Sequence, residues 1–193
     1  MGTSVTIMLL AGVAISALSG AGIGFMSFVA NDQMLRDLSL WQMGSLAGAN
    51  WTSITLCAVT LLILMVIFMR KAMPLNALLL GEAEANHLGI PVQKLKRQLI
   101  LLTAIGVGVT VSVSGMIGFI GLVIPHLGRM LSGPDHRTLL PISALMGALL
   151  LTFADMFSRV AFAPAELPVG IVTAIIGAPF FIYLLFKQKG KIL

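Results

Sequence analysis

Residues 73–97 read MPLNALLLGEAEANHLGIPVQKLKR and form the one long polar interval of an otherwise apolar sequence. The pattern predicts a bend between two helices. Residues 76–87 favour a short helix, Gly89 is placed to end it in the left-handed conformation, and Pro91 stands where a second helix would begin. Basic residues flank the interval, with Arg70 and Lys71 before it and Lys94, Lys96 and Arg97 at its end. Because cytoplasmic loops of membrane proteins carry an excess of Lys and Arg, we expect this elbow, residues 73–97, to face the cytoplasm.

The composition predicts an all-α, polytopic membrane protein. Of the 193 residues, 58% are hydrophobic and only 10% are charged, and the mean hydropathy is +1.04, which is not the composition of a soluble globular domain. The net charge of +5 comes from basic residues in loops between apolar runs, as membrane orientation requires, so we expect no nucleic-acid partner. The single cysteine, Cys57, excludes an internal disulfide and a cysteine metal cluster.

Apolar runs predict about six transmembrane helices and one external interfacial helix. The first run has 24 uncharged residues, which reach roughly 36 Å at 1.5 Å per residue and can cross a hydrocarbon layer of roughly 30 Å. The expected spans are residues 6–29, 51–69, the two halves of 98–125, 139–158 and 167–186. Residues 31–50 carry acids, an arginine and nearby tryptophans, and we expect them to lie at the external interface.

Residues 98–125 lack charge altogether, and a simple window would treat them as one overlong helix. A single crossing would place Arg129, Arg137 and the lysines near the end of the chain outside, against the positive-inside bias, whereas a hairpin returns them to the cytoplasm. We therefore expect a break around residues 114–118. Non-helical backbone at membrane depth is tolerated only inside protein or beside water, so Ser112, Ser114, Gly115 and Gly118 are expected inside the assembly.

Two sequence features, a pair of opposite charges and a stripe of small residues, each have both a structural and a functional interpretation. Asp155 and Arg159 stand four residues apart on one expected helix, so they form either an intrahelical ion pair or a site where Arg159 meets a carboxylate of an external partner. Small residues recur at Ser16, Gly20 and Gly24 in the first span, which favours ordinary helix packing and leaves a pathway lining as the alternative.

Motifs for covalent chemistry or nucleotide hydrolysis are missing from the sequence. It has no GxxxxGK[ST] phosphate loop and no HExxH motif. If ATP drives a process here, the ATP is used by another subunit, and the elbow is the surface available to receive force from it. A proton-coupled transporter would need ionisable groups at mid-membrane depth, and no expected span has an Asp, Glu, Lys or Arg near its centre.

Several long strings resemble one family. Residues 81–92, GEAEANHLGIPV, resemble the cytoplasmic coupling segment of ABC importer permeases. Residues 118–141, GFIGLVIPHLGRMLSGPDHRTLLP, and residues 163–185, APAELPVGIVTAIIGAPFFIYLL, are similar to the iron-complex and cobalamin (FecCD-type) permeases. Residues 10–18, LAGVAISAL, and residues 40–51, LWQMGSLAGANW, extend the resemblance over essentially the whole chain. Among members of the family, the combination most resembles haemin permeases.

The resemblance implies a bacterial inner-membrane permease with both termini in the cytoplasm and one permease domain over residues 1–193. It implies a homodimer with a pathway along its axis, two cytoplasmic ABC ATPases, a periplasmic substrate-binding protein and surrounding lipid. The chain itself would bind no cofactor or metal and would have no catalytic residue. The cargo would be haemin, with a ferric siderophore or cobalamin as alternatives. Family members normally have ten spans, so we also weigh an inactive, truncated permease that lacks the N-terminal spans.

The resemblance also assigns residues by position. Arg159 matches the external arginine that meets an acidic residue of the binding protein, and Ser16, Gly20 and Ser27 are candidates for the pathway wall. The ATPase-coupling surface would be Glu82, Ala83, Glu84, Ala85, His87, Leu88 and Gly89.

Overall fold

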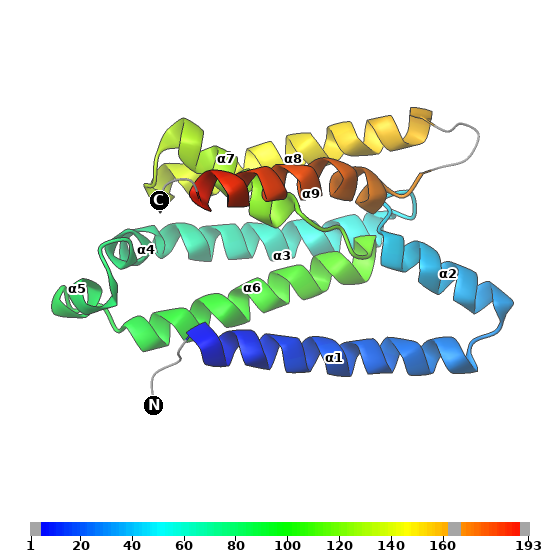
Figure 1. Ribbon diagram of the computed structural model, residues 1–193, viewed down its shortest axis with the longest axis horizontal. Helices are drawn as coiled ribbons and strands as arrows, with labels where there is room; N and C mark the ends of the chain where they lie inside the picture. Colours follow the sequence, from blue (N-terminus) through cyan, green and yellow to red (C-terminus); the bar gives the residue numbers. More distant parts are fainter. Residues whose placement is uncertain (1–4, 162–166, 190–193) are drawn as a thin grey trace. The chain divides into compact units, whose positions relative to one another are not determined.

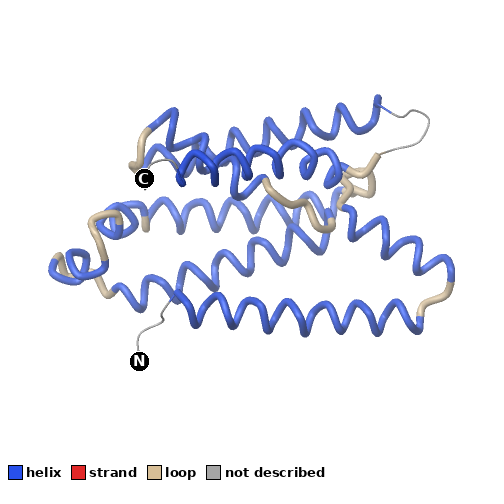
Figure 2. Tube along the Cα trace, in the orientation of Figure 1, coloured by secondary structure: helices blue, strands red, loops and turns tan. Residues whose placement is uncertain are grey.

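The computed structural model describes residues 5–161 and 167–189, and their regular structure is entirely helical (Figures 1 and 2). Their helices are α1 (Val5–Val29), α2 (Asp32–Met43), α3 (Trp51–Arg70), α4 (Ala72–Leu78), α5 (Glu82–His87), α6 (Val92–Ser114), α7 (Ile120–Ser132), α8 (His136–Ala161) and α9 (Val169–Lys189). The expected all-α fold is confirmed. The expected cytoplasmic location of both chain ends falls on residues outside the described ranges.

The chain divides into two compact units, Met1–Gln42 and Met43–Leu193, so the expectation of one permease domain stays a prediction. The first unit holds α1 and all of α2 except its last residue, Met43. The side chain of Asn31 caps α2 by accepting the backbone N–H of Met34 at 2.9 Å. None of the residues of α2 is buried, and the helix is much more polar than α1, as expected of an interfacial segment.

Four helices of the described chain are long and apolar enough to cross a membrane, namely α1, α3, α6 and α8. They coincide with the expected first, second, third and fifth spans. The fourth and sixth expected spans coincide with shorter apolar helices, α7 and the segment Val169–Leu184 of α9. The prediction of six full-length spans is thus confirmed for four of them. At 1.5 Å per residue the 13 residues of α7 reach only about 20 Å, less than the hydrocarbon thickness.

The expected break after residue 114 is present. Helix α6 ends at Ser114, Gly115 has φ 72°, and α7 begins only at Ile120. The intervening segment runs beside α9: the carbonyl of Met116 lies close to Gly170, and Phe119 lies against Gly177, about 10 Å further along the α9 axis. The fourth expected span is therefore a composite of this non-helical segment and a short helix. Gly115 is buried within the chain, whereas Ser112 and Gly118 are exposed.

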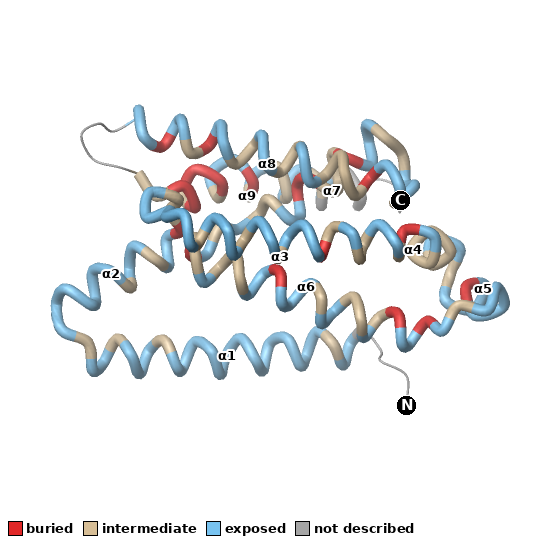
Figure 3. The backbone as a smooth tube through the Cα atoms, turned by 180° about the vertical axis from the view of Figure 1, so that it is seen from behind, coloured by how far each residue is buried: buried red, intermediate tan, exposed pale blue. Residues whose placement is uncertain are grey.

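Helices α7, α8 and α9 pack on one another, and α3 packs on α6. Glycines allow the close approaches. A Cβ on Gly128 of α7 would lie 2.9 Å from Leu139 of α8, and one on Gly106 of α6 would lie 2.7 Å from Leu64 of α3. Buried residues are few, and most large apolar side chains of the long helices are exposed (Figure 3). An exposed apolar surface of this extent is what a membrane or a partner helix covers.

Candidate functional site

Two short helices, α4 and α5, build the elbow at one end of the Met43–Leu193 unit (Figure 1). The prediction of a single helix over residues 76–87 is wrong, because Gly81 has φ 117° and separates α4 from α5. Only glycine adopts this backbone conformation readily. The preceding amides of Leu79, Leu80 and Gly81 donate to carbonyls three residues back, so α4 ends in a tightened turn.

The end of α5 matches the prediction at Gly89. This glycine has φ 81°, its N–H donates to the Asn86 carbonyl at 2.9 Å, and the Ile90 N–H donates to the Ala85 carbonyl at 3.0 Å. This bond pair is a Schellman cap, which fixes the chain direction after the helix. Helix α6 then begins at Val92, directly after Pro91, as the sequence predicts. The elbow is thus a defined turn rather than an irregular loop.

One of the predicted coupling residues is buried, and the others are exposed. Ala85 is 0% exposed and anchors α5 on the rest of the chain. Leu88 is 63% exposed, and Leu80, which the sequence reasoning did not single out, is 66% exposed. The other predicted coupling residues, Glu82, Ala83, Glu84, His87 and Gly89, are also exposed. Exposed leucines on a polar turn are typical of a surface that a partner covers.

An ion pair braces α5 against α6. The carboxylate of Glu82 accepts a hydrogen bond from the ammonium group of Lys96, and the lysine side chain is largely covered while the glutamate is exposed. The Glu84 carboxylate folds back over Gly81, where a Cβ would lie 2.5 Å from Glu84 Oε2. Both acids are thus engaged within the elbow, and the exposed leucines on either side of them, Leu80 and Leu88, are left for contact with a partner.

A second contact ties α4 to the start of α8, and the sequence reasoning missed it. Asn76 Nδ2 donates to Asp135 Oδ1 at 2.6 Å, and Asn76 Oδ1 accepts the His136 backbone N–H at 2.8 Å. The carboxylate of Asp135 also accepts the backbone N–H of Arg137, and this bond, followed by that from Asn76, holds the pKa of Asp135 below its usual value. Residues 133–136 read GPDH, with an aspartate directly before an apolar helix. This pattern indicates that Asp135 caps α8, but it gives no sign of the bond to Asn76.

Arg159 lies near the other end of α8. It is 23 residues beyond His136, or about 35 Å along the helix axis. Its Nε donates to Asp155 Oδ2 at 2.8 Å, so the intrahelical ion pair left open by the sequence is formed. The arginine side chain is 47% exposed. The elbow and Arg159 therefore mark opposite ends of one helical unit.

Comparison with known proteins places these features in a family. The model of the FecCD transport family matches residues 1–187. The chain belongs to the FecCD transport family. This is a family of multi-pass ABC transporter permeases, transmembrane subunits without catalytic activity of their own, which agrees with the missing nucleotide motifs.

Individual relatives agree with this membership. The chain is 48% identical over 184 residues to the hemin transport system permease HmuU of Yersinia pestis, covering 95% of this chain and 55% of that protein. It is 44% identical over 186 residues to the vitamin B12 import permease BtuC of Vibrio cholerae, covering 95% of this chain and 55% of that protein. The chain spans about half the length of the curated relatives it matches.

One solved structure resembles the fold closely. That structure is described as an inward-facing conformation of a metal-chelate type ABC transporter. The two folds agree with a TM-score of 0.88, and the two chains are 36% identical in sequence. The match covers 95% of this chain and 60% of the other. The helical arrangement described above is therefore that of an ABC transporter membrane domain.

The pathway residues predicted for this FecCD permease all lie on α1, in the first unit. Ser16 and Gly20 are exposed, and a Cβ on Gly20 would meet nothing within 4 Å. The hydroxyl of Ser27 donates to the Ile23 carbonyl at 2.9 Å, so this serine satisfies its hydrogen bond within its own helix. Their role in a pathway stays a prediction.

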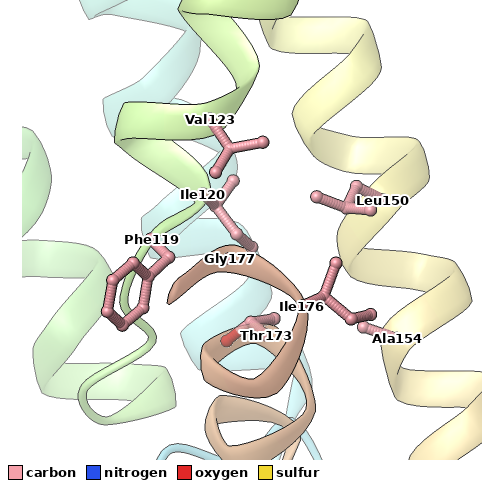
Figure 4. A pocket seen from close by; sticks show the side chains of 8 residues that line it. All are labelled: Phe119, Ile120, Val123, Leu150, Ala154, Thr173, Ile176 and Gly177. Atoms are coloured by element: carbon pink, nitrogen blue, oxygen red, sulfur yellow. The ribbon is translucent and has the colours of Figure 1, made fainter. Parts of the chain in front are cut away.

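A small cavity between α7, α8 and α9 does not suit an iron complex. Its volume is about 20 Å³, and the side chains around it are apolar apart from Thr173, whose hydroxyl donates to the Gly170 carbonyl (Figure 4). The lining residues are Phe119, Ile120, Val123, Leu150, Ala154, Thr173, Ile176 and Gly177. Ligand sites normally enclose several hundred Å³. Among the described residues, no three His, Cys, Asp or Glu side chains lie close enough to hold a metal ion.

Proposed function

We propose that this chain is a membrane-spanning permease of an ATP-driven importer that moves an iron complex from the periplasm to the cytoplasm by alternating access. A cytoplasmic ABC ATPase binds the elbow, and closure of two ATPases on ATP moves the elbows of a permease homodimer. A periplasmic binding protein delivers the cargo near Arg159. The chain resides in the bacterial inner membrane, with the elbow inside, and it binds neither ATP nor nucleic acid.

The observation that carries the proposal is the elbow. Leu80 and Leu88 are exposed on a turn whose direction is fixed by two positive-φ glycines, Gly81 and Gly89. The Lys96–Glu82 pair and the buried Ala85 attach α5 to the rest of the unit. A rigid apolar surface can pass the displacement of a bound partner to the helices behind it, whereas a flexible loop would deform instead.

The position of Arg159 supports a second docking surface. It lies about 35 Å along α8 from His136, a separation that exceeds the roughly 30 Å thickness of the hydrocarbon core. The guanidinium side chain is 47% exposed while its Nε donates to Asp155. Because the group is accessible from solvent, we propose that a carboxylate of the binding protein pairs with it there.

For the cargo, haemin is the first candidate, because the 48% identical relative is a hemin permease. Cobalamin is the second, supported by the 44% identical vitamin B12 permease. Uptake of haemin, a ferric siderophore and cobalamin, measured side by side in the complete importer, distinguishes these cargoes. Absence of uptake of all three would favour an inactive permease fragment.

Cross-linking tests the docking of the ATPase at the elbow. In a Cys57→Ala background, Leu88→Cys should cross-link to the ATPase subunit of the importer in membranes. Trp51→Cys, at an exposed position where α3 begins, is the matched control and should give no ATPase product. Equal cross-linking from both positions, or none from position 88, would refute docking at the elbow.

A further inference from the structure

A single asparagine joins the elbow to a distant helix pair. Asn76 on α4 uses both ends of its amide: Nδ2 donates to Asp135 Oδ1, and Oδ1 accepts from the backbone N–H of His136. The Nδ1 atom of His136 also lies 2.8 Å from Asn76 Oδ1 and donates to it in the Nδ1-protonated tautomer. These three contacts, which we name the Asn76 clasp, join residues about 60 positions apart in the chain.

The clasp binds the corner between α7 and α8. Gly133, with φ 80°, ends α7 and donates its N–H to the Arg129 carbonyl, and Asp135 directly precedes α8. Asp135 accepts the Arg137 N–H with its side chain and the Leu139 N–H, at 2.9 Å, with its backbone carbonyl. The atoms that hold Asn76 therefore also fix the first turn of α8, so a displacement of Asn76 acts directly on that helix.

Two side chains of α4 and α5 make hydrogen bonds to other elements. Among the described residues from 72 to 91, side-chain hydrogen bonds that reach other elements are made by Asn76 and by Glu82. The Glu82 bond goes to Lys96 on α6, the next helix along the chain. For the described side chains of α4 and α5, the clasp is thus the polar connection to the α7–α8 pair.

We propose that Asn76 is a positioning residue, which passes displacement of the elbow to α8 through Asp135 and His136. The proposal rests on the proposed function, because the displacement comes from the ATPase. Helix α8 carries Arg159 near its far end, so the clasp begins a connection through one continuous helix between the two docking surfaces. Without the clasp, the elbow moves while α8 lags behind it.

A distance measurement that needs no ATPase tests the contact itself. With Cys57→Ala, spin labels at Ala83→Cys on α5 and Met130→Cys on α7 report how firmly the elbow is held; both positions are exposed. Asn76→Ala and Asp135→Ala should each broaden the distance distribution, and the double variant should be no broader than either single variant. Asp135→Asn is the matched control, since its Oδ1 still accepts both N–H groups. An unchanged distribution in Asn76→Ala would overturn the clasp.

A charge variant covers the case in which the alanine variants fold poorly. Asn76→Asp brings two carboxylates together and should broaden the distribution, and adding Asp135→Asn should narrow it again, because one charge is removed and an amide donor is supplied. Failure of this rescue, with folded protein in both samples, would also overturn the proposal.

Coupling is then measured in the complete importer. Asn76→Ala should keep ATP hydrolysis and lower uptake per ATP by at least about fivefold, the lower range of coupling between sites. Uptake per ATP equal to that of the parent, despite a broadened distance distribution, would overturn the positioning role. The proposed function is tested separately, by the Leu88→Cys cross-link described above. If that cross-link does not form, docking of the ATPase at the elbow is refuted, but the effect of Asn76 on the measured distances still stands.

Discussion

Gly170 is the position where a single methyl group should do most damage. A Cβ there would lie 2.1 Å from the Met43 carbonyl oxygen and 3.1 Å from that of Met116, whereas carbon and carbonyl oxygen atoms normally stay at least about 3.3 Å apart. Both oxygens belong to backbone, and the Gly170 N–H donates to the Gly44 carbonyl at 3.3 Å. No side-chain rotation can relieve the overlap, so α9 or the segment before α3 must shift.

The expected cost follows from the overlap. Overpacking by one methyl group costs typically 1–3 kcal/mol, and about 2 kcal/mol is reasonable here because Gly170 is only the second residue of α9 and gains little from the higher helix propensity of alanine. At 1.4 kcal/mol per tenfold change, the folding equilibrium constant of Gly170→Ala should fall roughly 30-fold.

Unfolding by SDS titration in mixed micelles, followed by helix content, measures this difference. Gly108→Ala is the matched control: it lies inside α6, and a Cβ there would meet nothing within 4 Å, so the variant should be neutral or more stable by up to about 1 kcal/mol. If Gly170→Ala were as stable as Gly108→Ala, the close approach of the three backbone segments would be refuted.

Three further predictions concern the elbow and the far end of α8. Gly89→Val, which forces a β-branched residue to φ 81°, should uncouple ATP hydrolysis from uptake while insertion is kept, and Gly89→Asn should do so less; normal uptake by the valine variant would contradict the elbow assignment. Arg159→Glu should weaken docking of the binding protein about tenfold or more in a reconstituted assay, whereas Asp155→Asn should not; an unchanged affinity would remove the docking role. Because the pKa of Asp135 is lowered in the folded state, its contribution to stability is present above about pH 4 and is lost as the pH falls through the folded value. The difference in thermal midpoint between the parent and Asp135→Asn should therefore vanish in acid, and a difference that persists would contradict the hydrogen bonds to this carboxylate.

The sequence predicted those parts of the fold that depend on charge and on backbone chemistry. The basic residues after residue 125 required a hairpin, and the break after Ser114 is present. Gly89 occupies the left-handed conformation that its position after EAEANHL indicated. The first inference rests on the distribution of charge across the membrane and the second on the backbone preference of a single glycine, and neither needs knowledge of tertiary contacts.

Other features could not be predicted from local patterns. Gly81 follows three leucines and reads like part of a continuing helix, and only the folded chain shows its φ of 117°. The shortness of α7 was missed because an apolar string has the same composition whether it is helical or extended. The bond between Asn76 and Asp135 joins residues 59 positions apart, and one sequence gives no signal for such a pair.

The non-helical segment beside α9 has a consequence for the lipid around the protein. Within the described structure, the amides of residues 116–119 donate to no carbonyl, and Met116 and Gly118 are exposed. Acyl chains offer no acceptor to such groups, so this strip of the surface must be shielded from the lipid annulus by protein or by water. A tryptophan introduced at position 116 should therefore escape quenching by brominated phospholipids, while one at the exposed position 145 on α8 should be quenched.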